Sequence, residues 1–92
     1  MLLDSDINNT YELALAKWGK KSLVMDYMEG SAELLKELSR NLKGEKNLDQ
    51  ICQEIAKVSV IIEQIIRAYE ANNSVLKNKH EILIRLRERV KR

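Results

Sequence analysis

The amino-acid sequence predicts an all-α fold, and three observations carry this prediction. The 92 residues include no proline and only three glycines, so few positions interrupt a helix. Apolar residues make up 45% of the chain, which is too many for a disordered chain. These residues recur at spacings of three and four, which is the period of a helix. We therefore expect a single domain over residues 1–92, with residues 1–5 as a loose lead-in and four helices in an antiparallel bundle.

The first helix is expected to run from about residue 6 to Trp18. Acidic residues at its start suit the positive end of the helix dipole. Its apolar side chains share one face and are Ile7, Tyr11, Leu15 and Trp18. Gly19 then ends the helix.

The second helix is predicted over residues 21–42, with one apolar face and one acidic stripe. The apolar face consists of Val24, Met28, Leu35, Leu38 and Leu42. The stripe consists of Asp26, Glu29, Glu33 and Glu37 and lies nearly opposite that face. A functional site on the stripe requires a cover, which the first helix, the third helix or a second subunit can provide.

The third helix is expected to follow the loop 43–46 and to end near Tyr69. Gly44 suits the position just after a helix, and Asn47 with Gln50 matches a capping box. The apolar residues of this helix alternate four and three apart at Ile51, Ile55, Val58, Ile62, Ile65 and Tyr69. Such a wide apolar face predicts the central core helix, in contact with more than one neighbour.

The fourth helix is predicted from about Ser74 to Val90, after a left-handed stop at Asn72 or Asn73. Its inward residues are expected to be Val75, Leu76, Ile82, Leu83, Leu86 and Val90. The single cysteine, Cys52, cannot form an internal disulfide, which is consistent with a reducing cytoplasm. Its thiol is expected to be buried inside the protein. No signal peptide and no apolar run of membrane-spanning length is present, so we expect a cytoplasmic protein without a membrane partner.

The charge of the chain is unevenly distributed. Residues 77–92 contain seven Lys and Arg and two Glu, which gives this segment a charge of +5. Because the net charge of the chain is +2, residues 1–76 have a charge of −3. A basic last helix suits phosphate binding, and it also suits a solvated helix whose cations favour its C-terminus. No nucleic-acid signature and no glycine-rich phosphate loop is present, so nucleic acid is not the expected partner.

Three carboxylates are candidate metal ligands. Glu29 and Glu33 lie one helical turn apart, and Glu54 is brought toward them when the third helix folds back on the second. Carboxylates that converge from facing helices form divalent-metal sites in helical bundles.

The flanking residues carry a family resemblance over about residues 10–90. Trp18-Gly19, Ala32-Glu33-Leu34 and Glu54-Ile55-Ala56 resemble the MazG-like, all-α nucleotide pyrophosphohydrolases. The family signature is Glu-Glu-x-x-Glu on one helix and Glu-x-x-Asp on the next. Gly30 stands in place of the second Glu, and Lys57 stands in place of the Asp.

The resemblance implies Mg²⁺-dependent hydrolysis of a nucleoside triphosphate to a monophosphate and pyrophosphate. It implies a MazG-like helical bundle completed by dimerisation, with Glu29, Glu33 and Glu54 on the metal. It also implies that Trp18 lies near the base, and that Lys77 and Lys79 reach the phosphates, from the same or the other subunit of a dimer.

The two departures from the signature leave two hypotheses open. In one, Lys57 pairs with Glu33 or Glu54 in place of a metal, and the chain is a catalytically inactive, dimeric binding or regulatory module with a protein partner. In the other, Lys57 contacts a substrate phosphate beside one Mg²⁺. The sequence assigns no catalytic residue and leaves open whether the protein is an enzyme. Its small size and the wide apolar face of the third helix predict a homodimer.

Overall fold

The structure is a computed structural model that describes all 92 residues, and it contains three helices and no strands. The helices are α1 (Asp4–Leu42), α2 (Leu48–Ala68) and α3 (Asn72–Val90). The predicted all-α class is confirmed. The count is three and not four because the first two predicted helices form one element that bends at Gly19. None of the helices combines the length and the apolar character that crossing a membrane requires.

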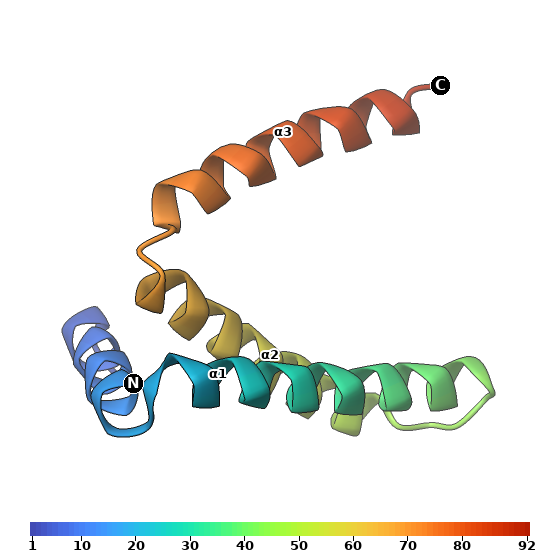
Figure 1. Ribbon diagram of the computed structural model, residues 1–92. Coiled ribbons are helices and arrows are strands. Elements are labelled where there is room, and N and C mark those ends of the chain that lie inside the picture. The colour runs from blue at the N-terminus through green and yellow to red at the C-terminus, as the bar shows by residue number, and fades with distance from the viewer.

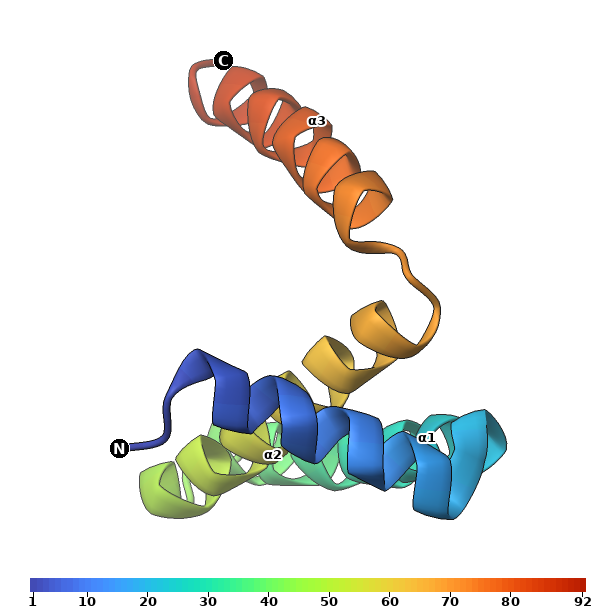
Figure 2. The ribbon, with the colours of Figure 1, turned by 90° about the vertical axis from the view of Figure 1, so that its left-hand side faces the viewer.

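Gly19 produces the bend in α1. Its φ of 82° and ψ of 169° lie in a region that is essentially restricted to glycine. The segment 4–18 therefore turns across the rest of α1 instead of continuing its line (Figure 2). The predicted break at Gly19 is confirmed, whereas the lead-in is shorter than expected. The helix already begins at Asp4, and the Leu3 N–H donates to the Asp6 carboxylate at 3.3 Å.

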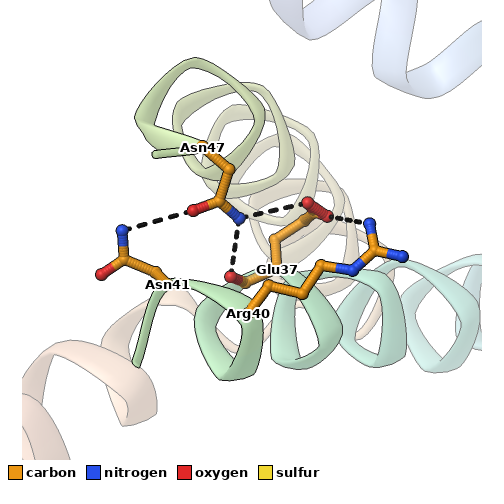
Figure 3. A network of polar contacts seen from close by, with 4 residues as sticks. All are labelled: Glu37, Arg40, Asn41 and Asn47. Atoms are coloured by element: carbon orange, nitrogen blue, oxygen red, sulfur yellow. Dashed lines mark hydrogen bonds and ion pairs between the residues drawn. The ribbon is translucent and has the colours of Figure 1, made fainter. Parts of the chain in front are cut away.

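The α1–α2 turn is held by a buried asparagine (Figure 3). The Asn47 amide donates to the Glu37 carbonyl at 2.9 Å and to the Glu37 carboxylate at 3.2 Å. The Asn41 amide donates to the Asn47 side-chain oxygen at 3.3 Å. Asn47 occupies the N-cap position, but its side chain caps nothing, so the predicted capping box with Gln50 is wrong. Its hydrogen bonds instead tie the start of α2 to the last turns of α1.

Gly44 has the role that the sequence predicts. Its φ is 99°, and the next N–H, that of Glu45, donates back to the Arg40 carbonyl at 3.2 Å. This is the backbone pattern by which a glycine closes a helix C-terminus. The chain can therefore reverse at once, and α2 returns along the second half of α1.

The core lies between α1 and α2. Its buried apolar residues are Leu23, Ile51, Val58, Ile61 and Ala68. Gly30 is buried where α1 faces α2. A Cβ at that position would lie 3.5 Å from Ile61 Cδ1 and 3.6 Å from Val58 Cγ2. The absence of a large side chain at this position thus lets α2 approach the side of α1 that carries the acidic stripe. The predicted apolar face of α1, from Val24 to Leu42, consequently does not face α2, and most of it is exposed.

Helix α3 extends away from the α1–α2 hairpin (Figure 1). It touches α2 near their connection and does not contact α1. The residue with positive φ in this connection is Glu70, at 50°, so the predicted left-handed stop at Asn72 or Asn73 is wrong. The Ala71 N–H donates to the Ile66 carbonyl at 2.9 Å and closes α2.

One chain therefore does not form the expected four-helix antiparallel bundle. The predicted inward residues of α3 are exposed, apart from the half-buried Val75, because no surface of the chain reaches them. Cys52 is exposed as well, contrary to its predicted burial, because it lies on the face of α2 away from α1. The radius of gyration is 16.1 Å. A compact chain of this length would give roughly 12 Å.

Candidate functional site

The candidate site is centred on Lys57, whose ammonium group lies between two carboxylates. Its Nζ atom is 3.1 Å from Glu33 Oε2 on α1 and 3.3 Å from Glu54 Oε2 on α2. Glu54 is the more buried acid, with 18% of its side chain exposed against 47% for Glu33. The buried Glu54 Oε2 accepts no hydrogen bond, so the nearby ammonium is what compensates its charge. Helix α2 thus lies beside the acidic stripe of α1, but only Glu37 is half-buried, whereas Asp26, Glu29 and Glu33 are exposed.

Lys57 and Glu33 hold each other in their charged forms. The hydrogen bond from Lys57, followed by its charge, lowers the pKa of Glu33 below the ordinary value. The contacts of Lys57 with Glu33 first, and with Glu54 second, raise the pKa of Lys57 above its ordinary value.

The third predicted ligand, Glu29, lies beside this cluster and not in it. A cavity of 310 Å³ is lined by Asp26, Glu29, Gly30, Glu33, Lys57 and Ile61. Glu33 and Glu54 meet at Lys57, whereas Glu29 makes no hydrogen bond or ion pair. No group of three or more His, Cys, Asp or Glu side chains is gathered closely enough to hold a metal ion. As arranged, the residues do not fit Mg²⁺, because the ammonium stands where a shared cation would lie.

A larger open cleft of 1180 Å³ adjoins this cavity, and Asp26 lines both. It lies between the segment 4–18 and the α1–α2 hairpin. Trp18 lines it with 63% of its surface exposed, so a planar ligand could reach the ring. The Tyr11 hydroxyl donates to Glu63 at 2.8 Å, and Arg67 pairs with Glu12 across the cleft. Burial, followed by the Glu63 contact, raises the pKa of Tyr11.

The cleft is strongly acidic. Its five carboxylates, against the single cation Arg67, come from Asp4, Glu12, Asp26, Glu63 and Glu70. Phosphates would be repelled here unless they brought a cation. Lys77 and Lys79, which are also predicted phosphate ligands, lie on the exposed α3. Within a single chain, α3 does not contact α1.

Sequence reasoning missed the pairs that join segment 4–18 to α2. Glu63 and Arg67 are one turn apart, so their side chains project from the same side of α2. That spacing was the available signal. It could not show that Tyr11 and Glu12 would lie opposite, because the direction of segment 4–18 depends on the backbone at Gly19.

Comparison with known proteins identifies no relative: no protein-family model, no curated protein and no solved structure matches the chain. The resemblance to the MazG-like family therefore remains a prediction from sequence motifs.

Proposed function

We propose that the chain is a MazG-like helical protein in which Lys57 replaces the divalent metal, and that it acts as a dimeric binding or regulatory module and not as a hydrolase. The observation that carries this proposal is the position of the Lys57 ammonium, 3.1 Å from Glu33 and 3.3 Å from Glu54. These are two of the three residues that the resemblance assigns to the metal.

The chemistry of an ammonium group explains why such a site would not turn over nucleotides. A lysine neutralises carboxylates by donating hydrogen bonds, as Lys57 does to Glu33. It has no open coordination positions at which phosphate oxygens and an attacking water could bind together. Its positive charge also repels a dication, and Gly30 supplies no carboxylate to offset that repulsion.

The second candidate is a Mg²⁺-dependent nucleoside triphosphate pyrophosphohydrolase. One observation favours it: Asp26, Glu29 and Glu33 line a single cavity, and the first two make no ion pair. In this version Lys57 would leave the carboxylates and contact a substrate phosphate, with Trp18 on the base in the adjoining cleft. The product would be a nucleoside monophosphate with release of pyrophosphate.

Calorimetric titration with Mg²⁺ and Mn²⁺ separates the two candidates, with and without a non-hydrolysable nucleoside triphosphate. We expect no metal-binding heat from the wild-type protein. Lys57→Asp together with Gly30→Glu restores the signature acids and should introduce metal binding. Lys46→Asp, in the exposed α1–α2 loop, is the control for added charge because it makes the same Lys-to-Asp change as Lys57→Asp, away from the site.

Metal-dependent nucleotide binding by the wild-type protein would contradict the module and favour the hydrolase. A folded double variant that still binds no metal would contradict the origin of the site as a metal centre. Equal binding by the Lys46→Asp control would show that added charge, and not the restored site, attracts the ion.

A further inference from the structure

The acidic cleft between segment 4–18 and the α1–α2 hairpin has an apolar floor and a charged rim. Its floor is made of apolar side chains that are buried or half-buried, from Ile7, Leu15, Leu23, Ile66 and Ala68. Its rim is made of carboxylates that are all exposed, from Asp4, Glu12, Asp26, Glu63 and Glu70. Such a cleft suits a ligand that is apolar where it meets the floor and cationic along its edges.

Most of the rim carboxylates are available to a ligand. Glu12 pairs with Arg67, and Arg67 is the only cation in the lining of the cleft. The Glu63 carboxylate accepts a hydrogen bond from the Tyr11 hydroxyl at 2.8 Å. The remaining three carboxylates make no ion pair within the chain and belong to Asp4, Asp26 and Glu70. Unpaired acidic groups around a concave surface attract cationic ligands and repel phosphates.

The Trp18 ring adds an aromatic surface to the same cleft. Its exposure of 63% leaves most of the ring open to a ligand. The Lys17 ammonium already lies over this ring, 5.2 Å from its centroid. Ring faces attract Lys and Arg, whose aliphatic stems also pack on apolar surface. The ring therefore favours the same long cationic side chains as the carboxylates of the rim.

The cleft has the size of a short helix. A helix about 10 Å wide that rises 1.5 Å per residue fills roughly 120 Å³ per residue. The cleft volume of 1180 Å³ therefore corresponds to roughly ten residues, or about three turns. A metal ion or a polyamine would leave the apolar floor uncovered. A helix with an apolar stripe between Lys and Arg side chains would cover the floor and meet the rim at once.

We propose that the acidic cleft binds a basic amphipathic helix of a partner protein, with the apolar stripe of that helix on the floor and its Lys and Arg side chains at the rim. This proposal names the class of partner for the binding module and in that respect rests on the proposed function. It depends on the cleft and not on Lys57, so peptide binding and the metal titration can fail separately.

Helix α3 is the competing occupant because it is itself basic and amphipathic. It begins at Asn72, which lines the cleft, and then extends away from the hairpin (Figure 1). If α3 folded back within the chain, its first three turns would bring only Lys77 and Lys79, together with Glu81. Its other five cations follow residue 84, beyond the length that the cleft holds. One chain therefore does not satisfy its own cleft, and a second copy remains as the alternative source of a basic helix.

Fluorescence of Trp18 tests the proposal, because this residue is the only tryptophan and lines the cleft. The probe is a synthetic amphipathic helix of about 15 Leu and Lys residues, and its control has Glu in place of every Lys. We expect the Leu/Lys peptide to shift Trp18 emission to shorter wavelength in a saturable manner. The Leu/Glu peptide should bind at least about tenfold more weakly, and so should spermine, which has charge but no apolar stripe.

Three results would overturn the proposal. Equal binding of the two peptides would show that charge does not select the ligand, and no binding of either would show that the cleft takes no helix. Light scattering of the full chain gives the third. A fall in mass as the Leu/Lys peptide is added would show that the peptide displaces α3 of a second copy, which would then be the occupant.

A pair of variants locates the binding surface. Glu70→Lys and Glu81→Lys make the same change at exposed positions, the first on the rim of the cleft and the second on α3 away from it. We expect Glu70→Lys to weaken binding of the Leu/Lys peptide by roughly tenfold, because it replaces an attraction with a repulsion. Glu81→Lys should leave binding unchanged. Circular dichroism confirms that each variant remains helical, and equal effects of the two variants would contradict the assigned cleft.

Discussion

The α1–α2 hairpin and helix α3 have similar sequence patterns but differ in how much of their apolar surface is buried. Both regions combine apolar residues at helical spacing with charged residues on the other faces, and both are helical. The hairpin contains every buried residue of the chain, whereas α3 has none. The difference shows that local sequence is enough to form a helix, whereas a helix is buried only where another surface of the molecule packs against it. Gly30 and Asn47 supply that pairing in the hairpin, and α3 has no equivalent.

The sharpest test of this comparison removes the same side-chain atoms from each region. Ile61→Ala in α2 empties a core position that is 9% exposed, whereas Ile82→Ala in α3 changes one that is 57% exposed. We expect Ile61→Ala to lower the free energy of unfolding by about 2–4 kcal/mol, and Ile82→Ala by less than about 0.5 kcal/mol. Denaturant unfolding followed by circular dichroism measures both. A large loss from Ile82→Ala would show that α3 is buried in the protein in solution.

The Asn47 contacts should give the next largest effect. Asn47→Ala removes the side-chain amide that donates hydrogen bonds to the carbonyl and the carboxylate of Glu37. Because position 47 is buried, the Glu37 carbonyl loses this hydrogen bond. We expect a loss of about 2–3 kcal/mol in the free energy of unfolding. The matched control is Asn78→Ala on the exposed face of α3, which should change stability by less than about 0.5 kcal/mol. Similar values for the two variants would mean that the Asn47 hydrogen bonds do not hold the α1–α2 turn.

The parts of the fold that could be predicted are those that depend on one segment at a time. The helical class, the break at Gly19 and the helix end at Gly44 each follow from local backbone preferences. The covered side of α1 could not be predicted, because its strongest apolar face, which includes Met28 and Leu35, is not the one that meets α2.

The candidate site follows the same division. Glu33 was predicted as a ligand from its one-turn spacing to Glu29, and Glu54 from the return of the next helix. The structure brings the carboxylates of Glu33 and Glu54 together at Lys57. That Lys57 would reach between them was only one of two hypotheses, since the outcome depends on how closely the helices approach. The small residue at position 30 permits that approach, and a single glycine within a helical pattern does not reveal its neighbours in advance.

Gly30 provides a smaller effect of opposite sign. An added Cβ would meet Ile61 and Val58 at ordinary contact distances, so alanine fits without displacing α2. Gly30→Ala should therefore stabilise the protein by about 0.5–1 kcal/mol, because alanine has the higher helix propensity. Gly30→Leu has no such space and should destabilise it by at least about 1–3 kcal/mol. Thermal unfolding of the two variants measures the difference. A destabilised alanine variant would show that the helices are closer than 3.5 Å contacts allow.

The smallest effect concerns the ion pair between Lys57 and Glu33, whose side chains are 51% and 47% exposed. The lowered pKa of Glu33 means that its contribution to stability is present above the ordinary glutamate value of 4.5 and is lost as the pH falls through the lowered pKa. The raised pKa of Lys57 means that its contribution is present below 10.5 and is lost as the pH rises through the raised pKa. Lys57→Met should therefore lower stability between these limits and flatten both flanks of the unfolding midpoint against pH. Lys79→Met, on α3, should leave the profile unchanged because that ammonium group has no carboxylate partner. If both variants flatten the profile equally, the Lys57 contacts are no stronger in solution than the unpaired charge on α3.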